Sequence, residues 1–146
     1  MILSKFAERL GDFMDDSADN GLTLADKLGC GKNTIYRYLQ ANRMPSVTMT
    51  VLIADYFKCT TDFLLGLEDV NYSCNFPPCP AFKDRFPLLL QECGISQYKL
   101  EKITKISHSL MGYWKSGTKK PSLYNIIKIA KALDCSVDFV LGRTKM

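Results

Sequence analysis

Residues 45–66 read PSVTMTVLIADYFKCTTDFLLG, and residues 121–142 read PSLYNIIKIAKALDCSVDFVLG. Nine of the 22 aligned positions are identical, and several others exchange one apolar side chain for another. The offset of 76 residues continues outside this stretch without an insertion, as in the pairs Phe6 and Phe82, Arg9 and Arg85, Leu24 and Leu100. Units of about 65 residues can fold alone. The repeat therefore predicts two related globular domains in one chain.

The segment between the two copies is rich in proline, with Pro77, Pro78 and Pro80 inside residues 70–81. Proline lacks a backbone N–H and restricts the residue before it, so we expect an extended linker here. The predicted organisation is a first domain at residues 1–69, a linker at 70–81 and a second domain at 82–146.

Each copy has the pattern of short helices, and no segment alternates with period two for long. The expected helix caps and ends are Ser4, Ser46, Thr60 or Thr61, Gly66, Ser122, Ser136 and Gly142. Pro87 fits its helix only within about the first turn. These signals predict an all-α fold of two tandem five-helix domains.

The middle of each copy contains two short amphipathic helices joined by a tight turn. In the first copy, residues 22–46 read LTLADKLGCGKNTIYRYLQANRMPS; in the second, residues 95–122 read ISQYKLEKITKISHSLMGYWKSGTKKPS. We expect helices at 22–28 and 32–40 of the first copy. Tyr38 and the equivalent Trp114 fall on the inward face and are predicted to lie in the core.

Both copies resemble the lambda-repressor/Cro-like (XRE) helix-turn-helix family. The resemblance rests on LADKLGCGKNTIYRYL, RMPS and IADYFKCTTDFLLG in the first copy, and on SQYKLEKITKISHSLMGYW, GTKKPS and IAKALDCSVDFVLG in the second. The second copy departs from the family at Glu101, where alanine is favoured, and at Lys105, where glycine is favoured. The first copy has Gly21 where the family often has glutamine, whereas the second keeps Gln97.

The resemblance implies that the second helix of each motif enters the major groove of DNA. Carried over, the DNA-binding residues of the first copy are Lys32, Asn33, Tyr36, Arg37, Gln40 and Arg43. Those of the second copy are Gln97, His108, Ser109, Gly112, Tyr113, Ser116 and Lys119, with Lys115 and Lys120 as further backbone contacts. The alternative is that these residues form an ordinary solvated helix face.

The resemblance implies a sequence-specific DNA-binding transcriptional regulator, a repressor, whose two modules grip two sites about 34 Å apart on double-stranded DNA. The charges of the two copies differ: residues 1–70 carry 7 Lys/Arg and 10 Asp/Glu, a net −3, and residues 71–146 carry 12 and 5, a net +7. The alternative is therefore an antitoxin- or antirepressor-like interaction protein, in which the acidic first domain contacts a protein partner and only the second binds DNA. The acidic cluster Asp12, Asp15, Asp16 and Asp19 leaves both possibilities open. Homodimerisation is a further expectation from the family.

Other classes of protein fit the sequence less well. No apolar run reaches the ~20 residues of a transmembrane helix, and the start lacks the pattern of a signal peptide, so we expect a cytoplasmic protein. The family resemblance implies that a bacterium or phage encodes it. A lone histidine without a Cys or Ser partner, the lack of a glycine-rich phosphate loop and the lack of a carboxylate pair with a metal-ligand signature indicate a non-enzymatic protein without a cofactor. Cys74 and Cys79 form a C-x4-C pair without a second pair, which argues against a zinc site and leaves a redox role open.

Overall fold

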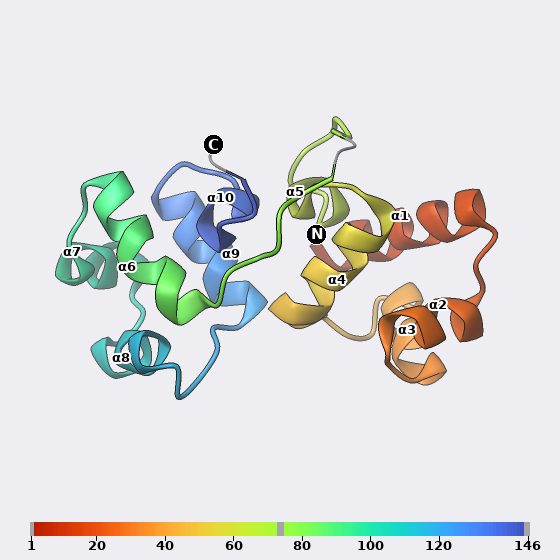
Figure 1. The fold of residues 1–146 in the computed structure, drawn as a ribbon, viewed down its shortest axis with the longest axis horizontal. Coiled ribbons are helices and arrows are strands. Elements are labelled where there is room, and N and C mark those ends of the chain that lie inside the picture. Colours follow the sequence, from red (N-terminus) through yellow and green to blue (C-terminus); the bar gives the residue numbers. More distant parts are fainter. Residues whose placement is uncertain (1, 73–74, 145–146) are drawn as a thin grey trace. The chain divides into compact units, whose positions relative to one another are not determined.

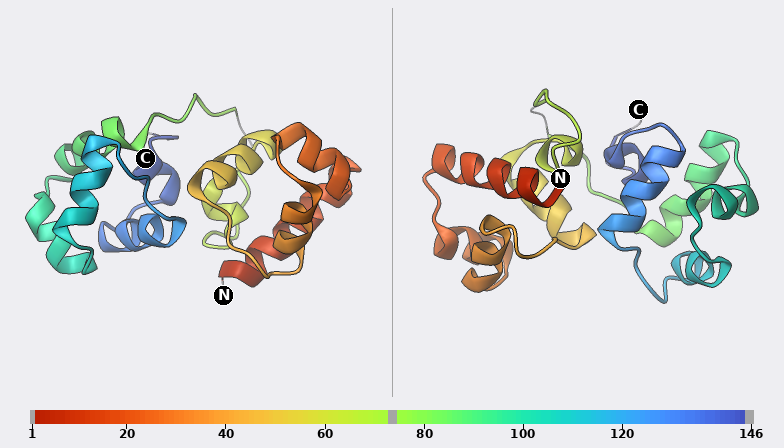
Figure 2. Two further views of the ribbon diagram at one scale, coloured as in Figure 1. Left: turned by 90° about the horizontal axis from the view of Figure 1, so that it is seen from below. Right: turned by 180° about the vertical axis from the view of Figure 1, so that it is seen from behind.

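The computed structural model describes residues 2–72 and 75–144, and every regular element in these ranges is an α-helix. The chain divides into two compact units, which we call the first unit (residues 1–75) and the second unit (residues 76–146). Figures 1 and 2 show that each unit is a bundle of short helices. Each unit has five described helices, which confirms the predicted fold class.

The first unit packs its helices around Phe6 and Leu10 of α1, both of which are fully buried. Its helices are α1 (Ile2–Ser17), α2 (Gly21–Leu28), α3 (Lys32–Leu39), α4 (Val47–Phe57) and α5 (Thr61–Leu64). Helix α1 packs against α3 and α5, and α4 packs against α5. The ring of Phe6 lies edge-on to Tyr38, with centroids 5.5 Å apart. Burial of Tyr38 confirms its predicted place in the core.

The second unit repeats this arrangement around Trp114. Its helices are α6 (Phe82–Cys93), α7 (Gln97–Thr104), α8 (His108–Ser116), α9 (Leu123–Ala132) and α10 (Val137–Leu141). Helix α6 packs against α8 and α10, and α9 packs against α7 and α10. Trp114 is 1% exposed and lies edge-on to Phe82 and Phe86, at centroid distances of 5.9 and 5.7 Å. The prediction that Trp114 is a core residue is confirmed.

The serine and threonine caps of the fourth and fifth helices of each unit are as predicted. The side chains of Ser46, Thr60, Ser122 and Ser136 each accept a hydrogen bond from the backbone N–H three residues later. Each cap satisfies one of the N–H groups that a helix start leaves without a partner. Gly142 is the C-cap of α10 and adopts the left-handed conformation. In the first unit the C-cap of α5 is Leu65, and the left-handed Gly66 follows it.

Two predictions about the first helix of each unit are wrong. Ser4 is not a cap, because α1 already begins at Ile2; Ile2 and Leu3 are half-buried, and this burial extends the helix past the serine. Pro87 is the sixth residue of α6 rather than a first-turn residue. The proline is exposed, while Phe86 and Leu89 on the opposite side are fully buried, so core packing maintains the helix despite one missing hydrogen bond.

An arginine at equivalent positions ties the first helix of each unit to its last helix. Arg9 donates through Nη1 to the carbonyl oxygens of Phe63 and Glu68, and its guanidinium lies 4.0 Å from the centroid of the Phe63 ring. Arg85 donates through Nη2 to the Phe139 carbonyl at 2.6 Å and stands 4.9 Å from that ring. We call this arrangement the arginine clamp. It satisfies carbonyl groups near the end of α5 and within α10 in the same way.

Part of the predicted linker lies against the second unit. The ring of Phe76 is 4.1 Å from Cζ of Arg143, which in turn is paired with Asp138 at 2.5 Å. Cys79 Sγ donates to the carbonyl oxygen of Leu141 at 3.4 Å. The boundaries 1–69, 70–81 and 82–146 stay a prediction, and Cys74 lies outside the described residues.

Candidate nucleic-acid interface

The first unit forms a helix-turn-helix from α2 and α3. Asn20 caps α2 in a reciprocal capping box with Thr23, in which each side chain accepts from the other residue's backbone N–H. The helix ends at Gly29, whose φ of 72° lies in the left-handed region that glycine adopts without strain. Cys30 and Gly31 follow, and α3 begins at Lys32. The short turn fixes the angle at which α3 leaves α2.

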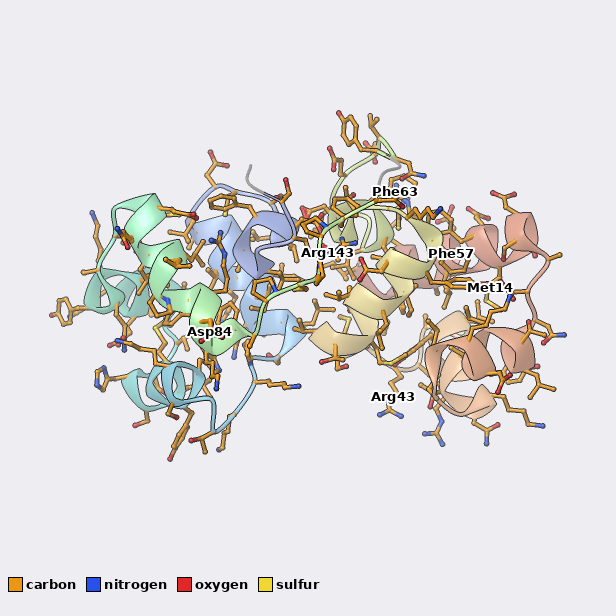
Figure 3. The ribbon with its side chains drawn as sticks, viewed as in Figure 1. Met14, Arg43, Phe57, Phe63, Asp84 and Arg143 are labelled. Carbon is orange, nitrogen blue, oxygen red and sulfur yellow. The ribbon has the colours of Figure 1, made fainter. Side chains whose placement is uncertain are left out.

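The buried and exposed faces of α3 separate the core from a candidate binding surface. Ile35 and Tyr38 are buried. The six residues predicted to bind DNA are all exposed, and we call them the first reading surface: Lys32, Asn33, Tyr36, Arg37, Gln40 and Arg43. Figure 3 shows Arg43 in the connection between α3 and α4, with its side chain directed away from the ribbon. All six side chains are thus exposed, on α3 or in the segment directly after it.

Tyr36 lies directly over Gly21, the first residue of α2. A Cβ atom built on Gly21 would lie only 2.7 Å from Cζ of Tyr36, closer than van der Waals contact allows. Gly21 is buried beneath this ring, whereas Tyr36 itself stays 45% exposed. The tyrosine therefore fills the space above a position that carries Gln97 in the second unit.

The acidic residues of the first unit do not neutralise the first reading surface. Asp19, whose side chain is 3% exposed, accepts hydrogen bonds from Ser17, Tyr56, Thr23 and Lys27. These hydrogen bonds lower the pKa of Asp19 to about 2. The bond from Ser17 contributes most, and those from Lys27, Tyr56 and Thr23 act in the same direction. Lys32, Arg37 and Arg43 make no ion pair with a described residue.

The second unit builds its motif from α7 and α8. Ser96 caps α7, and Ser107 caps α8, each by accepting from the backbone N–H three residues on. Between the helices, Lys105 adopts φ 62° and closes α7 in the left-handed conformation. The predicted departure at this turn is therefore real: a lysine takes a conformation in which glycine would be less strained.

The second reading surface comprises the seven predicted residues of this unit: Gln97, His108, Ser109, Gly112, Tyr113, Ser116 and Lys119. Six of them are exposed, and Gln97 is half-buried. The ammonium of Lys119 lies 4.7 Å from the centroid of the Tyr113 ring, within the range of a cation–π contact. Met111 and Trp114 hold the opposite side of α8 in the core. This surface is richer in hydroxyl groups than the first one.

Glu101 joins α7 to the start of the second reading surface. Its Oε2 lies 2.8 Å from Nδ1 of His108 and 2.8 Å from Nε2 of Gln97. Two hydrogen bonds lower the pKa of Glu101: the bond from His108 has the larger effect, and the bond from Gln97 comes next. Lys115, which we expected at the DNA backbone, donates to Oε1 of Gln97 at 3.1 Å. The sequence marked Glu101 only as an unusual residue and did not indicate this cluster.

Two short helices joined by a tight turn, present twice and each with a polar outer face, define a DNA-binding helix-turn-helix protein. The sequence model of the helix-turn-helix family matches residues 19–64 and 88–140, one segment in each unit. The chain therefore belongs to the lambda-repressor/Cro-like (XRE) helix-turn-helix family, with two tandem modules. No curated protein and no solved structure matches the chain significantly.

Membership in this family makes the protein a DNA-binding regulator of a class that is typically non-enzymatic. Among residues 2–72 and 75–144, no helix is long and apolar enough to cross a membrane. Within the same ranges, no group of three or more His, Cys, Asp or Glu side chains is arranged to hold a metal ion.

Proposed function

We propose that the protein is a cytoplasmic transcriptional repressor, without enzymatic activity, that binds operator DNA through both of its helix-turn-helix units. The distribution of charge in the first unit supports this proposal best. That unit is acidic overall, yet the three cations of its reading surface have no acidic partner among the described residues. Lys27, outside the reading surface, is instead paired with Asp19 at 3.1 Å. Unpaired cations on a recognition helix suit phosphates and guanine edges.

The two reading surfaces carry different chemistry, which favours an operator with two unlike half-sites. The first offers lysine, arginine, asparagine and glutamine, whereas the second offers histidine, serine and tyrosine. Two recognition helices on one face of DNA are spaced about 34 Å apart, one helical turn. Linkage in one chain raises the local concentration of the second unit once the first has bound.

The first test is selection of binding sites from random duplex DNA by the intact protein at one stated salt concentration, because phosphate contacts make affinity depend on salt. A bipartite motif with a spacing of about one turn is the expected result. A single short motif would contradict use of both units.

Charge reversal separates this function from that of an interaction protein with one DNA-binding unit. Lys32→Glu and Arg37→Glu should each weaken binding to the selected DNA by about 10-fold or more, the scale of one good base contact. Lys58→Glu is the matched control, because Lys58 is exposed in the same unit but lies at the end of α4. Unchanged DNA affinity in the first two variants would favour a first unit that binds a protein partner. The homodimer, a separate expectation, is tested by analytical ultracentrifugation of the free protein.

A further inference from the structure

The cluster around Glu101 is specific to the second unit. The residues equivalent to Gln97, Glu101 and His108 in the first unit are Gly21, Ala25 and Lys32, which cannot form the same bonds. Glu101 has a side chain only 15% exposed, whereas that of His108 is 82% exposed. A nearly buried carboxylate thus lies beneath an open imidazole at the first position of α8.

The hydrogen bonds of the cluster fix the orientation of the Gln97 amide. Lys115 Nζ is a donor only, so the amide atom 3.1 Å from it is the oxygen. The amide nitrogen then faces Glu101 Oε2, an acceptor, at 2.8 Å. Both ends of the amide are therefore matched, and the amide has one consistent orientation.

The same logic fixes which nitrogen of His108 carries the proton. Nδ1 lies 2.8 Å from the carboxylate oxygen, and an unprotonated Nδ1 would direct its lone pair at those of Glu101. Nδ1 therefore carries the hydrogen and donates it to Glu101. Gln97 Nε2, 3.4 Å from Nδ1, is then a second donor to the same carboxylate and not a partner of the ring. In the neutral ring, Nε2 on the far side is left as an acceptor.

We propose that Glu101 is a specificity-determining residue of the second reading surface: it holds His108 in the Nδ1–H form, so that Nε2 accepts a hydrogen bond from the exocyclic amino group of adenine or cytosine. This inference rests on the proposed DNA-binding function. In the major groove, adenine N6 and cytosine N4 are the donors that such an acceptor can select. Glu101 acts as a positioning residue, because the contact to DNA comes from His108.

The first experiment does not depend on DNA. His108 is the only histidine of the chain, so the ring signals of the untagged, ¹⁵N-labelled protein need no assignment. At about pH 8, long-range ¹H–¹⁵N correlation should show the Nδ1–H form in the wild type. Glu101→Ala should lose this preference, and Ala25 shows that the fold accepts alanine at the equivalent position. Asp134→Asn, which removes one negative charge at an exposed left-handed residue of the same unit, should leave the ring signals unchanged. A wild-type ring in the Nε2–H form would overturn the proposal.

The second experiment measures base preference with the intact chain. Glu101→Ala should lose about 10-fold affinity for the wild-type optimum and change the preferred base at one position of the second half-site. A uniform gain of affinity for all sequences in Glu101→Ala, with or without the same gain in Asp134→Asn, would reduce Glu101 to a repulsive charge and overturn the proposal. If wild type selects no duplex, the DNA-binding function itself fails, while the ring signals still report whether the cluster exists.

Discussion

At the scale of single residues, Gly21 and Tyr36 act as one pair within the first reading surface. The glycine has no side chain, and the tyrosine ring occupies the space that a side chain would need. Tyr36 is an exposed and movable group, so a larger residue at position 21 would displace the ring instead of opening the core. The pair therefore links the start of α2 to the position of a predicted DNA contact.

We predict that Gly21→Ala weakens DNA binding by about 3- to 10-fold without lowering the melting temperature by more than about 2 °C. Tyr36→Ala should have a similar effect, and the double variant should lose little more, because both single changes remove the same placed ring. Fluorescence anisotropy with the selected duplex measures the affinities of the wild type, the two single variants and the double variant. Gly11→Ala is the control: its Cβ would meet Leu39 at an ordinary 3.8 Å, so affinity should not change. Additive losses in the double variant would contradict the pairing.

Asp19 should make the free energy of unfolding of the first unit depend on pH in the acidic range. The folded-state pKa of about 2 lies below the ordinary value of 3.8, so the stabilisation is present above pH 4 and is lost as the pH falls toward 2. Asp19→Asn should therefore lower the melting temperature by about 5 °C at pH 7 and by much less near pH 2. Circular dichroism at the two pH values measures the difference. Asp16→Asn, at an exposed residue of α1, should show no comparable change.

At the scale of helices, the arginine clamp holds the last helix of each unit against the first. Three features meet at Arg85: a side chain 7% exposed, two backbone carbonyls as acceptors and the face of Phe139. Removal of the guanidinium would leave buried carbonyl groups without these donors, which costs more than the net value of the hydrogen bonds themselves.

We predict that Arg85→Met destabilises the second unit by about 2–3 kcal/mol, since methionine keeps much of the apolar stem but none of the donors. Urea unfolding followed by the fluorescence of Trp114 measures this, because Trp114 is the only tryptophan and is 1% exposed in the second unit. Arg85→Lys, which keeps the charge, should recover only part of the loss, because an ammonium cannot reproduce the planar fork. A midpoint unchanged in Arg85→Met would show that the clamp adds nothing to stability.

The helices and their inward faces could be predicted from the sequence, because their apolar spacing and caps are local signals. The alignment also marked Lys105 as a position where the family favours glycine, and its left-handed φ of 62° agrees with that preference. Pro87 was misplaced because burial of its neighbours outweighs the local cost of proline in a helix. The contacts of Tyr36 with Gly21, and of Glu101 with His108, join residues on different helices. They depend on the angle between two helices, which a single sequence does not encode locally.

At the scale of the whole molecule, the same framework supports two surfaces of different charge and chemistry. Each unit has its own core and its own arginine clamp. A unit of this length can form a stable fold by itself. We therefore expect the two units to unfold independently.

We predict that Arg9→Met, the equivalent change in the first unit, leaves the Trp114 unfolding midpoint unchanged while it lowers the stability of its own unit. Trp114 fluorescence reports on unfolding of the second unit alone, whereas circular dichroism reports on the helices of both units. Comparing the two signals therefore separates the stabilities of the two units. A shift of the Trp114 midpoint in Arg9→Met would show instead that the units are energetically coupled.

The contact between Phe76 and Arg143 has a practical consequence for dividing the molecule. The aromatic ring lies six residues before the start of α6, yet it covers a guanidinium that is buried together with Asp138. A fragment cut at Phe82 would discard this cover and expose one face of a buried charge pair to water. We therefore expect a self-sufficient carboxy-terminal module to begin no later than Phe76, the first residue of the second compact unit.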